Sequence, residues 1–184
     1  GGNNWTGLVN SWISRSLSYT ITVFPDNTNE IIATGDAGSS ILKSIDSGNS
    51  WIKIFELAIN QTVVDSRHGF TAVAISKSNP NIVYAGMRKA SNVGALDPSN
   101  DPSYGIYKSS DRGLTWIEMN NGLEGSTKII NVIAIDPHSE LIAYAGTLHD
   151  GIFKTIDGGE NWVLKNDGLP YSDVRSLAID PENT

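Results

Sequence analysis

Three aspartates of this 184-residue chain recur in one fixed sequence pattern, which makes them the first residues to test for chemistry. We call the pattern, Ser/Thr-x-Asp-x-Gly-x-Ser/Thr/Asn-Trp, the Asp motif; its copies span residues 44–51, 109–116 and 155–162. Their fixed positions are Ser44, Asp46, Gly48, Trp51, Ser109, Asp111, Gly113, Trp116, Thr155, Asp157, Gly159 and Trp162. A carboxylate between a hydroxyl and a glycine can accept hydrogen bonds from turn amides, and glycine takes a positive φ at little cost. The pattern therefore favours structural turns, with catalytic aspartates as the alternative.

Metal chemistry has one candidate location. Asp97, Asn100 and Asp101 offer oxygen ligands of the kind Ca²⁺ binds, but without the alternating spacing of an EF-hand loop. We therefore expect a solvated turn there, with a structural Ca²⁺ as the alternative. The chain contains no cysteine, and its three histidines lie in different repeats without metal-ligand spacing. No metal and no cofactor are expected.

Composition narrows the class of partner. The net charge of −7 leaves no basic stripe to neutralise phosphates, which argues against nucleic acid and against an anionic membrane surface. No apolar run reaches the roughly 18 residues that a membrane-spanning helix needs, so membrane insertion is not expected. An acidic, Asn- and Ser-rich chain without cysteine is compatible with a bacterial extracellular or cell-surface protein, which is the expected location.

The spacing of the tryptophans indicates the elements that carry these residues. Trp116 and Trp162 are 46 residues apart, as are Trp5 and Trp51. A period of about 40–50 residues with a tryptophan signature is typical of four-stranded β-propeller blades. In the third repeat the expected strands, rich in β-branched residues, are 130–135, 141–146, 151–155 and 161–165. We also expect Trp51, Trp116 and Trp162 to be buried at equivalent positions.

These strands predict an all-β chain that forms a segment of a β-propeller. The expected blades cover about residues 17–57, 69–120 and 128–166, with partial blades at 1–10 and 172–184. The first partial blade supplies an outer strand at Trp5, and the last supplies an inner strand at Val174–Ile179. These edges are expected to pair with further blades, with a second copy of the chain, or with each other in a small ring.

Candidate binding residues lie on one face of such a propeller. Because successive strands of a blade are antiparallel, the Asp motifs share one face with the turns between the first and second strands. The loops between the second and third strands and the loops between blades share the opposite face. Two insertions lengthen the middle repeat on that opposite face, near residues 56–69 and 88–103. Long loops gathered at one place often carry function, although tolerated surface insertions are the alternative. The candidates are Arg67, His68, Arg88, Asp97 and Asp101, with His149 and Asp150 in the matching turn of the third repeat.

The Asp motif resembles the Asp-box of BNR-type β-propellers, and the shared cadence covers nearly the whole chain. The resemblance is to bacterial repeat proteins of the sortilin-like and xyloglucanase-like kind and to photosystem II assembly factors. It implies a non-catalytic scaffold or binding module for protein or glycan. Sialidases also carry the box, but no arginine triad with a Tyr–Glu pair is legible in this chain. The cysteine-rich module of sortilin-type receptors is absent as well.

A fragment of a xyloglucanase-like glycoside hydrolase is the alternative that the resemblance implies. In that family one catalytic aspartate lies in a turn and is followed by glycine, and Asp36-Ala37-Gly38 occupies such a turn. Asp36 is therefore the candidate catalytic residue. A single carboxylate cannot act as both acid and base, so the second would lie outside this chain.

Overall fold

Short β-strands and tight turns make up the part of the chain that the computed structural model describes, namely residues 20–35, 40–57, 69–88, 104–123, 129–170 and 172–182. These residues contain no helix and form three four-stranded antiparallel sheets. Within each sheet, neighbouring strands follow one another in the sequence. This up-and-down order is that of a propeller blade. The predicted all-β fold of four-stranded antiparallel blades is confirmed.

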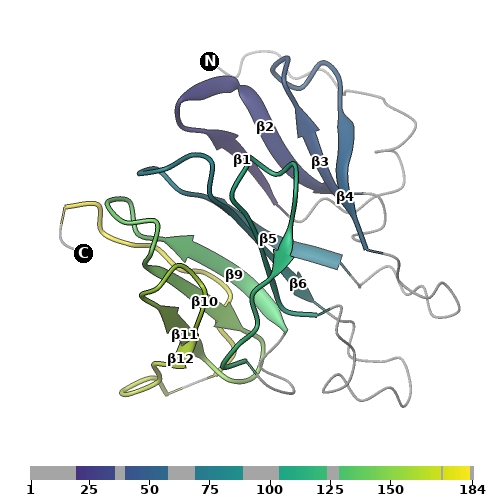
Figure 1. The fold of residues 1–184 in the computed structure, drawn as a ribbon. Coiled ribbons are helices and arrows are strands. Elements are labelled where there is room, and N and C mark those ends of the chain that lie inside the picture. Colours follow the sequence, from purple (N-terminus) through teal and green to yellow (C-terminus); the bar gives the residue numbers. More distant parts are fainter. Residues whose placement is uncertain are drawn as a thin grey trace, which may run out of the picture.

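The three blades follow one another along the chain (Figure 1). Blade 1 consists of β1 (Ile21–Phe24), β2 (Asn27–Gly35), β3 (Ser40–Ser44) and β4 (Ile52–Glu56). Blade 2 consists of β5 (Gly69–Ile75), β6 (Val83–Arg88), β7 (Ile106–Ser109) and β8 (Ile117–Glu118). Blade 3 consists of β9 (Ile130–Ile135), β10 (Ala143–Thr147), β11 (Ile152–Thr155) and β12 (Val163–Leu164).

The register of the second and third strands repeats from blade to blade. Lys43 pairs with Ile32 in blade 1, Lys108 with Tyr84 in blade 2, and Lys154 with Tyr144 in blade 3. A fixed register keeps every side chain on the same side of its blade, since a slip of one residue would reverse all of them. Each lysine that precedes an Asp motif is therefore placed identically.

The hydrophobic core lies between the blades. One buried cluster joins blades 1 and 2 and includes Phe24, Ile32 and Phe70; another joins blades 2 and 3 and includes Tyr84 and Trp162. At the second boundary β9 packs against β5 and β6. A Cβ atom added to Gly86 would lie 2.5 Å from Ile130 Cγ2, so this approach requires glycine.

Two expected terminal strands have different outcomes. The expected strand around Trp5, within 1–10, lies outside the described residues. The expected strand Val174–Ile179 was predicted wrongly, because no strand is assigned there. Its pattern suits an inner strand, but none of the described residues forms a ladder with it, and a strand exists only through such pairing. It contacts blade 3 at its start, where the Val174 amide donates to the Thr147 carbonyl oxygen at 2.9 Å.

Candidate functional site

The Asp motifs form three turns with one hydrogen-bond pattern. In the third, Thr155 Oγ1 donates to Asp157 Oδ1 at 2.7 Å and accepts the Gly159 amide at 2.9 Å. The two carboxylate oxygens of Asp157 accept the amide and the side-chain Nδ2 of Asn161 at 3.0 and 2.8 Å. The same four bonds recur around Asp46 and Asp111. Each carboxylate is thus bonded to groups within four residues of it.

These hydrogen bonds favour the charged form of each aspartate. The Thr115 hydroxyl and then its amide lower the pKa of Asp111 to about 2, and the Asn161 side chain and then its amide do the same for Asp157. The Ser50 hydroxyl lowers the pKa of Asp46. A general acid needs the opposite shift, because it must carry a proton near neutral pH.

The backbone of each turn is left-handed at two successive residues. Ser47, Arg112 and Gly158 have φ values of 60°, 62° and 74°, and the motif glycine that follows each has a φ near 90°. Two central residues with positive φ are the mark of a type I′ turn, which here lies within the loop that joins the third and fourth strands. The motif glycine is required here because this conformation disfavours a Cβ atom.

The tryptophans do not occupy equivalent environments, so that prediction was wrong. The indole Nε1 of Trp116 donates to Gly113 of its own turn at 2.9 Å, and Trp51 does the same with Gly48. Trp162 instead donates to the Met119 carbonyl oxygen of blade 2 at 3.0 Å and is only 2 % exposed. The neighbouring blade decides the difference: Trp116 stacks on Phe55 and stays half-buried, whereas Trp162 meets the edge of Tyr84.

The lysine before each motif joins one blade to the next. Lys43 Nζ donates to the Arg112 carbonyl oxygen at 3.2 Å, and Lys108 Nζ donates to the Gly158 carbonyl oxygen at 2.6 Å. Both acceptors occupy the same position, directly before the motif glycine of the following blade. The sequence analysis assigned these lysines no role, although their fixed place directly before the motif was the available signal.

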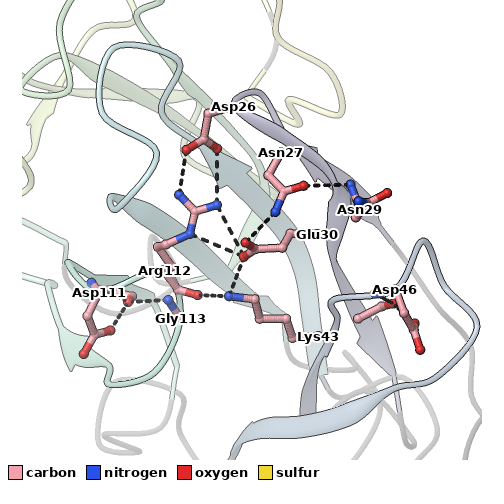
Figure 2. Close-up of polar contacts among 11 residues, drawn as sticks. Asp26, Asn27, Asn29, Glu30, Lys43, Asp46, Asp111, Arg112 and Gly113 are labelled. Atoms are coloured by element: carbon pink, nitrogen blue, oxygen red, sulfur yellow. Dashed lines mark hydrogen bonds and ion pairs between the residues drawn. The ribbon is translucent and has the colours of Figure 1, made fainter.

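An ionic network reinforces the boundary between blades 1 and 2 (Figure 2). The Arg112 guanidinium donates to both Asp26 oxygens at 2.9 and 3.2 Å and lies 3.3 Å from Glu30 Oε2, which also contacts Lys43 Nζ at 2.9 Å. The Arg112 hydrogen bond lowers the pKa of Asp26. Partial burial acts to raise the pKa of Glu30, but hydrogen bonds from Lys43 and Asn27 hold it below its usual value. The network therefore joins blade 2 to blade 1 through groups that are all ionised.

Two asparagines organise the opposite face. Asn120 Oδ1 accepts the Ile106 amide at 2.7 Å while its Nδ2 donates to the Tyr104 carbonyl oxygen at 2.9 Å. Asn166 makes the same pair of bonds to Ile152 and Asp150 at 2.9 and 2.8 Å. Each asparagine therefore binds the main chain directly before the third strand of its blade. Sequence reasoning missed both, although they lie 46 residues apart, at the period of the repeat.

The candidate ligand residues are only partly placed. His149 is exposed and Asp150 half-buried in the β10–β11 turn that Asn166 holds. Arg88 ends β6, but its side chain lies outside the described residues. The remaining candidates also lie outside them: Asp36, Arg67, His68, Asp97 and Asp101. The described residues thus contribute one candidate loop, at His149–Asp150.

In the described ranges, no three His, Cys, Asp or Glu side chains are grouped in a way that could hold a metal ion. Nor do these ranges contain a helix of the length and apolar character needed to cross a membrane.

Comparisons with known proteins identify the fold. No protein-family model and no curated protein sequence matches the chain. Among solved structures it is similar to an ancestral GH74 enzyme, with 18% identity and a TM-score of 0.59, over 79% of this chain and 18% of that one. The GH74 enzyme of Niastella koreensis matches at 22% identity with a TM-score of 0.56, over 84% of this chain and 23% of that one. YCF48 bound to D1 peptide matches at 18% identity with a TM-score of 0.51, over 80% of this chain and 40% of that one.

These likenesses are below 25% identity and concern the fold. The chain spans less than half the length of each of the structures named above. Both kinds of neighbour are β-propeller proteins. The repeated four-stranded blades and these structural likenesses together place the chain among β-propeller repeat proteins, as part of a propeller.

Proposed function

We propose that the chain is part of a non-catalytic, extracellular β-propeller module that binds a protein or a glycan, and that the Asp motifs serve as structural turns within it. The state of the described carboxylates carries this proposal. Every one of them with a shifted pKa is shifted downwards: Asp26, Glu30, Asp46, Asp111 and Asp157. A glycosidase needs one carboxyl whose pKa is raised. Downward shifts through turn and interface contacts favour structural roles.

The proposed ligand surface is the face opposite the Asp motifs. There two hydrogen bonds from the Asn166 side chain hold the main chain of the turn that carries His149 and Asp150. The candidate residues of the two insertions, Arg67, His68, Arg88, Asp97 and Asp101, are proposed to join it on this face. YCF48, which has a similar fold, has been solved with a bound peptide. That precedent supports a protein ligand for a propeller of this kind.

A binding screen with matched variants tests the proposal. The wild-type chain is applied to an array of plant and bacterial glycans and to a peptide library. For any ligand found, Kd is measured for His149→Ala and Arg88→Ala, with Glu160→Ala on the Asp-motif face as the control. We expect at least about tenfold weaker binding for the first two, equivalent to about 1.4 kcal/mol, and no change for the control. Equal effects from all three variants would place the ligand elsewhere.

The alternative function is a fragment of a xyloglucanase-like glycoside hydrolase. The likeness to GH74 structures favours it as an analogy of fold, and Asp36 is its candidate carboxylate. The test is release of reducing ends from xyloglucan by the chain and by Asp36→Asn. Our first proposal expects binding without hydrolysis. Hydrolysis that Asp36→Asn abolishes would establish the enzyme and overturn the non-catalytic module.

Two further proposals concern the surroundings of the module. Its free blade edges are proposed to meet further propeller blades or a second copy of the chain. No cofactor is proposed, and a structural Ca²⁺ at Asp97, Asn100 and Asp101 is the alternative. A melting temperature that is the same in EDTA and in millimolar Ca²⁺ is the expected result. A rise in Ca²⁺ that Asp97→Asn removes would establish the ion.

A further inference from the structure

The boundary between blades 2 and 3 shows how one blade covers the residues at the end of the preceding blade. The main chain of Trp162 lies directly on Gly122, where a Cβ atom would collide with the Trp162 carbonyl oxygen. The Trp162 amide donates to the Asn121 carbonyl oxygen at 2.9 Å, and Leu123 beside it is 2 % exposed. The Asp motif of one blade thus packs on the residues that follow the last strand of the preceding blade.

The same positions on blade 3 are open. Gly168 corresponds to Gly122 and has a similar φ of 83°, but none of the described residues places an atom within 4 Å of the position that its Cβ would take. Leu169 corresponds to Leu123 and is 41% exposed. Lys154 corresponds to Lys108; its Nζ lies over the Tyr144 ring at 5.0 Å, with no hydrogen-bond acceptor among the described residues.

The inner position of a following blade is already occupied. At the second boundary Thr71 Oγ1 donates to the Ile130 carbonyl oxygen at 2.5 Å, and Ile130 covers Gly86. On blade 3, Asn131 Nδ2 donates to the Val174 carbonyl oxygen at 3.1 Å, and Val174 covers Gly146 in the same way. Val174 therefore meets blade 3 as Ile130 of β9 meets blade 2.

We propose that the face of blade 3 that lies away from blade 2, formed by Tyr144, Lys154, Gly168 and Leu169, is the docking surface for a three-stranded antiparallel β-meander that carries an Asp motif. The meander pairs with Val174–Ile179 and completes a blade around it. Lys154 Nζ donates to the carbonyl oxygen before the glycine of that motif, as Lys43 and Lys108 do. This inference rests on the proposal that further blades extend the propeller, and it is independent of the ligand.

The surface also specifies part of the partner's chemistry. At the second boundary Asn121 Nδ2 donates to the Glu160 carbonyl oxygen at 3.3 Å. Blade 3 has Asp167 at the corresponding position, and a carboxylate only accepts hydrogen bonds. The main-chain carbonyl group at this place cannot donate, so the partner meets Asp167 with a side-chain donor at the position of Asn161, whose Oδ1 also accepts from Asn121 Nδ2 at the second boundary. A whole blade from a second copy does not fit, because its β1 would need the place that Val174–Ile179 holds.

The experiment adds the three strands of the proposed meander to the same chain. A copy of residues 141–170 is appended after Thr184, in register with the repeat, and its residue corresponding to Asn161 keeps the side-chain amide that donates to Asp167. Hydrogen exchange is measured at residues 174–179 in the native and extended chains. We expect at least about tenfold slower exchange in the extended chain, because a paired strand protects its amides.

Lysine variants in both chains test the contact itself. Lys154→Met should lower the melting temperature of the extended chain and leave the native chain unchanged, whereas Lys108→Met should lower both. If residues 174–179 are protected but Lys154→Met does not lower the melting temperature of the extended chain, the proposal of further blades stands and this docking surface is overturned. Unprotected amides in the extended chain, or concentration-dependent dimers of the native chain that protect β1, would also overturn it.

Discussion

At the scale of single residues, the Asp motif is a self-contained unit. The Asp157 carboxylate takes its hydrogen bonds from Thr155 and Asn161, all within the turn, and the turns of Asp46 and Asp111 repeat this arrangement. Three of the roughly four acceptor positions of such a carboxylate are thereby occupied within its own turn. Its physical effect is to hold a hairpin in which two successive residues have positive φ.

Removing one of these carboxylates should loosen the hairpin. Asp157→Ala leaves the Asn161 amide without its acceptor, so we expect a melting temperature several degrees below that of the wild type. Glu160→Ala, which removes the same charge from the same turn, is the control and should have little effect. Circular dichroism on heating makes the comparison. Equal losses in both variants would show that charge rather than hydrogen bonding matters.

The same carboxylates should make stability depend on acid. The pKa values of Asp111 and Asp157 fall from 3.8 to about 2 in the folded chain, so the unfolded chain binds protons more readily. Their contribution is complete above pH 3.8 and is lost as the pH falls through about 2. The double variant Asp111→Asn, Asp157→Asn should show a shallower fall in melting temperature over this range. A fall as steep as in the wild type would contradict the argument.

At the scale of elements, one blade completes the edge of another. Lys43 and Lys108 reach across to carbonyl groups of the following turn, and Gly122 leaves room for the Trp162 main chain. These contacts involve backbone on one side, so they tolerate side-chain change in the turn. Arg112 and Gly158 accordingly occupy the same place with different side chains.

Matched glycine substitutions measure this closure. Gly122 and Gly168 have φ values of 88° and 83°, so alanine at either should cost about 1–2 kcal/mol for the left-handed conformation. Gly122→Ala should cost about 1–3 kcal/mol more, because its Cβ meets the Trp162 backbone. Urea unfolding of both variants gives the two free energies. An equal loss of unfolding free energy at both positions would mean that the Trp162 main chain does not contact Gly122 in solution.

At the scale of the whole molecule, blade 2 is the only described blade with a described blade packed on each side. Its central strand β6 includes Val83, Tyr84, Ala85 and Met87, all 0% exposed. In blade 1, by contrast, Ile21 and Val23 of β1 are 63% and 46% exposed. The hydrophobic contribution to stability is therefore concentrated in the middle of the segment.

Local stability should follow this distribution. We expect amide hydrogen exchange to be slowest in β6 and faster in β1 and in the two-residue strands β8 and β12, since regions with fewer buried contacts open at lower free energy. Exchange followed by mass spectrometry of peptides, or by NMR, gives the order. Exchange of β1 as slow as that of β6 would show that its exposed face is covered in solution.

The sequence by itself determined the local features of this protein. The Asp motif works through contacts no more than four residues apart, so its residue types alone indicate the turn, and the 46-residue period indicates the strands around it. Of the candidate ligand residues that this local reasoning named, His149 and Asp150 lie in the β10–β11 turn, where Asn166 binds the main chain.

Only the tertiary structure decided the contacts between blades. Lys43 meets its acceptor 69 residues away. Trp162 contacts Tyr84 of β6 in blade 2, whereas Trp116 stacks on Phe55 of β4 in blade 1. Val174–Ile179 has the residue pattern of a strand and forms none, because a strand needs a ladder that the described residues do not supply. Contacts over such separations depend on which side chains neighbouring blades present, and no repeat pattern specifies that.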